Sequence, residues 1–151
     1  MSDSSPETVV RRFYDEVFNG GRFAAVDELL AEDFVNHDQE GTAHSAGRAG
    51  VRAMFQALRT AFPDLNYQTD DLFVAGDLVV DRGFSSGTHN GPLFSIPPSG
   101  RRFTMKEMHI NRVRDGQMVE HWGVSDSLKM RQDLGLGLSQ PAPTGGATPL
   151  A

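Results

Sequence analysis

The sequence predicts an α+β fold in which helices cover one face of a curved antiparallel sheet. Three segments with helical spacing of apolar residues come first, four segments rich in valine, phenylalanine and threonine follow, and one helix closes the chain. This segregation is typical of α+β domains, because parallel sheets are built from alternating strands and helices. A sheet curved under its helices makes a cone with one open end and a single apolar pocket.

The composition favours one soluble domain that binds neither nucleic acid nor a membrane. The chain has 151 residues, of which 38% are apolar and 23% charged, and its formal net charge is −6. Binding to a phosphate backbone needs basic patches, which an acidic chain opposes. No apolar run approaches the ~18 residues of a membrane span, and the first residues do not resemble a signal peptide. We therefore expect a cytoplasmic protein, and the absence of cysteine excludes disulfides and thiolate chemistry.

The first helix is predicted to start at Ser4-Ser5-Pro6 and to end at residues 19–21. A serine hydroxyl can cap the open backbone amides, and proline fits the first helical position. The Asn-Gly-Gly segment then ends the pattern. Between these signals, apolar residues recur at helical spacing: Val9, Val10, Phe13, Tyr14, Val17 and Phe18.

Two further helices and a short extended piece complete the first half of the chain. The second helix is predicted over residues 23–33 and leads into an extended piece at 34–37. Residues 38–47 are small and polar, which predicts a loop. The third helix covers residues 51–62 and ends at Pro63, because proline disfavours helix in the residue before it.

The second half is predicted to form two hairpins and a closing helix. Residues 66–75 and 78–89 are rich in strand-forming side chains and flank a Gly-Asp turn, as in a hairpin. Residues 91–100 contain three prolines and form a long turn. A second hairpin starts at Arg101, and a helix from Asp126 to Leu134 follows it.

Residues 6–135 are predicted to form the whole folded domain. Residues 1–5 and 136–151 contain few large apolar side chains and are predicted to be disordered. The sequence shows no internal repeat.

The second hairpin carries most of the chain's titratable groups, and its turn decides which of them share a face. Side chains alternate along a strand, so a slip of one residue inverts the set. A two-residue turn at Asp115-Gly116 would put one set on a common face: Glu107, His109, Glu120 and Trp122. A three-residue loop over 114–116 would instead place another set together: Glu107, His109, His121 and Gly123.

Several short segments together resemble one known family. They are Phe18-Asn19-Gly20, Asp33-Phe34-Val35-Asn36, Gly87-Thr88-His89-Asn90-Gly91, the segment from Ile96 to Phe103, His109 with Arg112-Val113-Arg114-Asp115-Gly116, and Gln132-Asp133-Leu134-Gly135. In this order and spacing, residues 6–135 resemble the SnoaL-like polyketide cyclases of the nuclear-transport-factor-2-like superfamily. The resemblance implies a cone-shaped α+β barrel, usually dimeric through the outer sheet face, with no metal or organic cofactor. Characterised members close a ring of an aromatic polyketide by intramolecular aldol condensation.

The resemblance also implies which side chains enter the pocket. Family members have a histidine at the position of His109, a polar residue at Glu107 and an asparagine at Asn36, which favours the three-residue loop. Their acid/base aspartate stands two positions after the histidine that matches His121, where this chain has Gly123. We therefore predict that Glu107 supplies the missing carboxylate.

The predicted catalytic roles follow from these positions. Glu107 and His109 are expected to move the proton, since a carboxylate raises the basicity of a neighbouring histidine. His121 and Asn36 are expected to stabilise an enolate. Asp126 is a reserve candidate, although the start of a helix more often uses an aspartate as a cap.

Other residues are predicted to contact the substrate or to serve the structure. Phe18 and Tyr14 are expected to form an apolar wall for a flat or lipophilic ligand. His89 either lines the pocket mouth or bonds within its turn, and Trp122 packs in the core or a dimer interface. The histidines lack a tight spacing such as HExxH, so no metal site is expected.

Together these observations predict a cofactor-free cyclase or isomerase that acts on a polyketide-like carbonyl compound. Two alternatives stay open. One is a small-molecule binding protein of the same fold that has lost the catalytic aspartate, and the other is a hydroxylase or hydrolase branch of the family. Fold alone does not separate them. The expected partners are a lipophilic or aromatic small molecule and a second copy of the chain.

Overall fold

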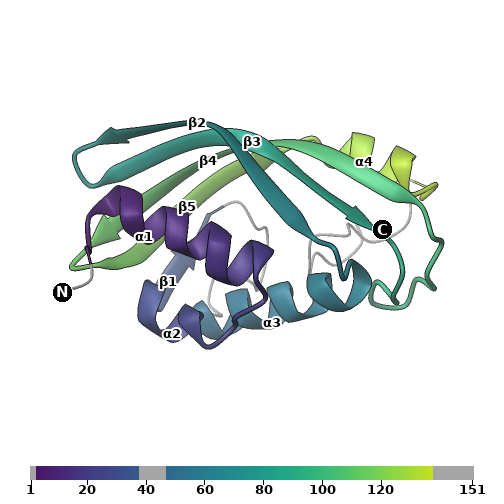
Figure 1. The fold of residues 1–151 in the computed structure, drawn as a ribbon, viewed down its shortest axis with the longest axis horizontal. Coiled ribbons are helices and arrows are strands. Elements are labelled where there is room, and N and C mark those ends of the chain that lie inside the picture. Colours follow the sequence, from purple (N-terminus) through teal and green to yellow (C-terminus); the bar gives the residue numbers. More distant parts are fainter. Residues whose placement is uncertain (1–2, 38–46, 138–151) are drawn as a thin grey trace.

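The protein forms one curved five-stranded sheet with most of its helices packed against one face (Figure 1). The computed structural model describes residues 3–37 and 47–137. The strand order is β1-β5-β4-β3-β2. The elements in chain order are α1 (Pro6–Arg12), the π-helix η1 (Phe13–Asn19), α2 (Ala25–Leu29), β1 (Leu30–Asn36), α3 (Gly47–Ala61), β2 (Asn66–Ala75), β3 (Leu78–Thr88), β4 (Arg102–Arg114), β5 (Gln117–Ser125) and α4 (Ser127–Asp133). The predicted α+β class is confirmed.

The first strand differs from the prediction. The second helix ends at Leu29, and Leu30–Asn36 forms a complete strand that pairs in parallel with β5. The sheet is therefore mixed, with one parallel pair at its edge. Leu30 fits the apolar spacing of the helix and that of the strand equally, so periodicity could not place the boundary. The parallel pairing sets Asn36 directly beside His121.

The first helix changes its winding halfway. Ser5 caps its start by accepting from the backbone amide of Thr8, as predicted. From Phe13 the chain continues as a π-helix, a form that is rare and frequent at functional sites. The end of this π-helix is tied to α3, because the Arg59 guanidinium donates to the backbone carbonyls of Phe18 and Asn19.

The turn of the second hairpin has two residues and not three. Asp115 and Gly116 both have positive φ, 49° and 74°, which is the type I′ geometry that matches strand twist. The register of β5 against β4 shifts by one residue further along. There β5 has an extra residue, Val119, between Met118, which pairs with Val113, and Glu120, which pairs with Arg112. This β-bulge restores the set of residues that the longer loop would have given. Glu107, His109, His121 and Gly123 therefore share the face toward the helices.

The two faces of the sheet differ in character. Odd-numbered residues of β3 and β4 point toward the helices, and they include the buried Val79, Phe103 and Met105. Even-numbered residues of these strands point outward. Three exposed apolar residues lie on that face: Met108 and Ile110 of β4 and Val124 of β5. Among the described residues, no helix is long and apolar enough to cross a membrane.

The closing helix packs on β4, and Asp126 caps it by accepting from the amide of Lys129. Leu136, just after this helix, packs against the core.

Residues 1–2, 38–46 and 138–151 lie outside the described residues. They include residues 38–46 of the predicted loop, residues 1–2 of the predicted disordered start and residues 138–151 of the predicted disordered tail. Ser5 of the predicted disordered start instead caps α1, and Gly47 begins α3.

Candidate active site

A continuous chain of hydrogen bonds crosses four neighbouring strands on the helix-facing side of the sheet. The Ser85 hydroxyl donates to Oε1 of Glu107, and Oε2 of Glu107 lies 2.8 Å from Nε2 of His109. Nδ1 of His109 lies 2.8 Å from Nε2 of His121, and Nδ1 of His121 lies 2.7 Å from Oδ1 of Asn36. We call these five residues the polar chain.

Strand geometry explains why these side chains meet. Glu107 and His109 are two residues apart on β4, so both point to the same face. The residue directly opposite His109 on β5 is Gly123, which has no side chain. The ring of His121 can therefore approach that of His109, and their centroids lie 5.0 Å apart. The residue that the family resemblance identified as a departure thus stands where the two imidazoles meet.

The order of donors and acceptors leaves one proton free to move along the polar chain. The amide oxygen of Asn36 can only accept, so His121 carries a proton on Nδ1. Nε2 of His121 can then accept from Nδ1 of His109. The proton between Nε2 of His109 and Oε2 of Glu107 can reside on either partner. Acid and base forms of both imidazoles therefore interconvert without breaking a contact, which suits proton transfer to and from a substrate.

The polar chain is shielded from water but not sealed. The side chains of Glu107 and His109 are 7% and 12% exposed, and His121, like His109, is half-buried. A low local dielectric strengthens the hydrogen bonds of such a network. The partial exposure of the imidazoles shows where a ligand can reach the polar chain.

A second polar cluster lies beside the first, and sequence reasoning missed it. Asp81 on β3 stands directly opposite His109 on β4 and is 1% exposed. Its Oδ2 accepts from the Tyr14 hydroxyl at 2.8 Å, and its Oδ1 accepts from the Tyr67 hydroxyl at 2.6 Å. The signal was present in the alternation of β3, because Asp81 falls between Val79 and Gly83 on the inward face.

Burial governs the protonation of this second cluster. It raises the pKa of Asp81 above its ordinary value, although both tyrosine hydroxyls and the charge of His109 act to lower it. Burial, and then the neighbouring Asp81, raises the pKa of Tyr14 and of Tyr67 well above the usual range of tyrosine. Both phenols therefore keep their protons and act as donors.

The remaining predicted site residues lie at different distances from the polar chain. The Tyr14 ring lies 6.4 Å from that of His109, and Phe18 packs on Tyr14 and Tyr67. His89 is fully buried against Phe62 and bonds Ser99, and no hydrogen bond joins it to the polar chain.

Asp126 and Trp122 lie away from the two clusters. The Asp126 side chain is exposed and caps α4, so the structure does not bring this reserve candidate to the imidazoles. Trp122 lies on the outer face, stacked on His37 at 4.8 Å.

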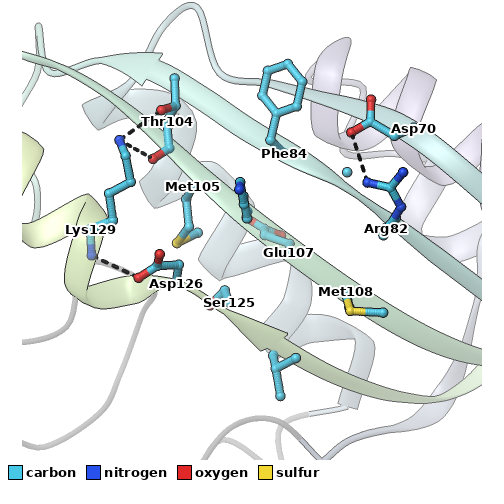
Figure 2. Close-up of a pocket in the computed structure, with 13 residues that line it drawn as sticks. Asp70, Arg82, Phe84, Thr104, Met105, Glu107, Met108, Ser125, Asp126 and Lys129 are labelled. Atoms are coloured by element: carbon cyan, nitrogen blue, oxygen red, sulfur yellow. Dashed lines mark hydrogen bonds and ion pairs between the residues drawn. The ribbon is translucent and has the colours of Figure 1, made fainter.

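The hollow that Figure 2 shows lies mainly on the outer face of the sheet and not under the helices. It has a volume of about 560 Å³. Its wall includes the outward side chains of Arg82, Phe84 and Met108 together with Asp126 and Lys129 of the closing segment. Glu107 also borders it, but its carboxylate bonds residues of the helix-facing side. The polar chain is therefore the candidate site, because this hollow contains no linked pair of imidazoles.

No metal site is formed by residues 3–37 and 47–137, where no group of three or more His, Asp or Glu is placed to hold an ion. His44 falls outside these ranges.

Comparison with known proteins assigns the chain to a family. The family model of SnoaL-like polyketide cyclases matches residues 8–134. The chain therefore belongs to the SnoaL-like polyketide cyclase family, which places it among enzymes of the cyclase class and confirms the nuclear-transport-factor-2-like fold.

Individual relatives agree with this assignment. The crystal structure of wild-type IdmH, a candidate polyketide cyclase from Streptomyces antibioticus, is 34% identical with a TM-score of 0.75, and the match covers 87% of this chain and 99% of that one. The aklanonic acid methyl ester cyclase DauD from Streptomyces sp. (strain C5) is 26% identical over 93% of this chain and 86% of its own length. The nogalonic acid methyl ester cyclase from Streptomyces nogalater is 28% identical over 69% of this chain and 78% of its own length.

Proposed function

We propose that this protein is a cofactor-free polyketide cyclase that closes a ring by intramolecular aldol addition. The observation that carries the proposal is the polar chain, in which a buried carboxylate contacts two linked imidazoles. Proton transfer to and from carbon needs a base and an acid held together in a shielded site, and this arrangement supplies both. The proposed substrate is a polyketide ester with an acidic C–H beside a carbonyl, as the names of the relatives suggest.

The proposed reaction balances without a redox partner. The Glu107–His109 pair takes a proton from the carbon between two carbonyl groups, and the C–H electron pair becomes an enolate. This enolate carbon attacks a ketone carbon of the same molecule, so one C–C bond forms while the C=O π bond becomes an alkoxide. An imidazolium of the polar chain then returns the proton to the alkoxide. Substrate and product are isomers.

Each residue of the polar chain has a role in this scheme. The positive charge that His121 gains when the transferred proton reaches its Nε2 is proposed to stabilise the enolate, because both of its ring nitrogens already bond neighbours in the polar chain. Asn36 is proposed to hold the orientation of His121 through the bond to Nδ1. Ser85 steadies the carboxylate from the other side. Tyr14 and Phe18 are proposed to face the flat part of the substrate.

The direct test is incubation of the purified protein with aklanonic acid methyl ester and with nogalonic acid methyl ester. Chromatography with mass detection should find a product of unchanged mass and changed retention. Binding of either ester without such a product would support the binding-protein alternative and would reject the cyclase proposal for that substrate.

We also propose that the outer face of the sheet is a homodimer interface. Met108, Ile110 and Val124 are 52%, 37% and 71% exposed, and they adjoin one another across paired strands. A contiguous apolar patch on an otherwise charged surface is typical of an interaction site. In a two-fold dimer the same patch on both copies would meet, so apolar side chains would cover apolar side chains.

A further inference from the structure

Asp81 is a buried titratable group that the proposed reaction leaves without a role. It is 1% exposed, and both of its oxygens accept from phenol hydroxyls. A carboxylic acid would have to donate from one oxygen, so this double acceptor geometry is that of the carboxylate. A buried negative charge is costly unless a positive charge lies nearby.

The surrounding elements hold this carboxylate in one place. The side-chain amide of Asn19 accepts from the backbone amide of Tyr67 at 2.7 Å and donates to its carbonyl at 3.1 Å, so β2 is fixed to the end of η1. Gly83 leaves room for the phenol, because a Cβ there would lie 3.0 Å from the Tyr67 hydroxyl and 2.0 Å from the Gln68 carbonyl oxygen. The position of Asp81 is therefore set by packing before any ligand binds.

The titratable groups that face Asp81 come from four elements. Tyr14 projects from η1 and Tyr67 from β2, while Glu107 and His109 project from β4 and His121 from β5. The two phenols stay neutral, and Glu107 is another acid. The imidazoles are thus the groups in this set that can carry a compensating positive charge.

We infer that Asp81 is a positioning residue that keeps the transferred proton on the imidazoles of His109 and His121 and off Glu107. This inference rests on the proposed function and deepens it. In a shielded site, a lone carboxylate and imidazole favour the neutral acid–imidazole pair, because separated charges are poorly solvated there. A second carboxylate opposite His109 reverses that preference. The proton taken from carbon then waits on nitrogen, where it can pass to the alkoxide.

The test is an NMR titration of the histidine side chains in the full chain, with wild type compared with Asp81→Asn. We expect the midpoint of His109 to fall by about one pH unit, the lower end of the effect of a nearby opposite charge. Asp71→Asn is the matched control. It also removes one carboxylate, but Asp71 lies on the neighbouring strand β2 and pairs with Arg82 on the outer face. An unchanged midpoint in Asp81→Asn, or an equal fall in Asp71→Asn, would overturn the inference.

A second variant and a kinetic measurement test the role of Asp81 separately from the proposed cyclase activity. If Asp81→Asn does not fold, Asp81→Ser removes the carboxylate while keeping a small side chain that can accept from a phenol, and it should lower the midpoint of His109 in the same direction; no fall there would overturn the inference. With an accepted substrate, Asp81→Asn should lower kcat more than it changes KM and move the acid limb of the pH–rate profile to lower pH, whereas Asp81→Glu should restore part of kcat. A titration shift without turnover of any ester would reject the proposed function alone, and turnover with an unshifted midpoint would reject the role of Asp81 alone.

Discussion

His109 and His121 are joined ring to ring, with Nδ1 of the first 2.8 Å from Nε2 of the second. One extra residue makes this contact possible, because the bulge at Val119 shifts β5 by one position against β4. Without it, side-chain alternation would turn His121 to the outer face. The bulge therefore decides whether the hairpin carries a connected acid–base pair or two unrelated histidines.

Glu107→Gln is predicted to lower kcat by about 100-fold or more, the usual contribution of a general base. Glutamine keeps the size and one acceptor oxygen of the side chain but cannot take up the proton. The matched control is Glu120→Gln on the outer face, where Glu120 pairs with His37 and Arg112. Steady-state turnover of an accepted ester measures the effect, and equal losses in the two variants would contradict it.

Asn36→Ala is predicted to change the tautomer of His121. The amide oxygen of Asn36 keeps the proton of His121 on Nδ1, so its loss should populate the tautomer with the proton on Nε2. Side-chain 15N chemical shifts report the tautomer directly. Turnover should fall by about 100-fold, because Nε2 can then no longer accept from His109. Asn66→Ala changes an exposed asparagine on β2 and should leave both readouts as in wild type.

Asp81→Asn is predicted to gain stability relative to wild type as the pH rises. Burial raises the pKa of Asp81 above 3.8, so the folded protein binds this proton more tightly than the unfolded chain. Ionisation of Asp81 therefore favours the unfolded state. As the pH rises from the unfolded pKa through the folded pKa, wild type loses the free energy of unfolding that the bound proton contributed. The variant lacks the titration. Urea unfolding at about pH 4 and about pH 7 should show a difference that moves in favour of the variant, and a constant difference would argue against a buried, destabilised carboxylate.

Val124→Asp is predicted to convert a dimer into a monomer. The new charge would lie within the exposed apolar patch, where a second copy would have to bury it. Val74→Asp is the matched control, because Val74 is also exposed but pairs with the inward-facing Val79. Sedimentation velocity distinguishes the two states. A wild type that sediments as a monomer over the accessible concentrations would remove the basis for the interface.

Secondary structure was predictable where one signal dominated. The serine cap and apolar spacing of the first helix, the Gly-Asp turn of the first hairpin and the cap at Asp126 all appear as predicted. The boundary at Leu30 was not, since the same leucine satisfies a helix and a strand. Parallel pairing of β1 with β5 is a contact between residues about 85 positions apart, which local propensity does not encode.

The sequence by itself determined which chemical groups are available and which of them share a strand face. The spacing of Glu107 and His109 places both side chains together in any sheet, because strand side chains alternate. Only the tertiary structure decided which groups join them. Packing of η1 and β2 brought two phenols onto Asp81, and the bulge at Val119 brought His121 and Asn36 into line. These contacts depend on register and on the approach of distant elements, and both are set by the burial of the whole core.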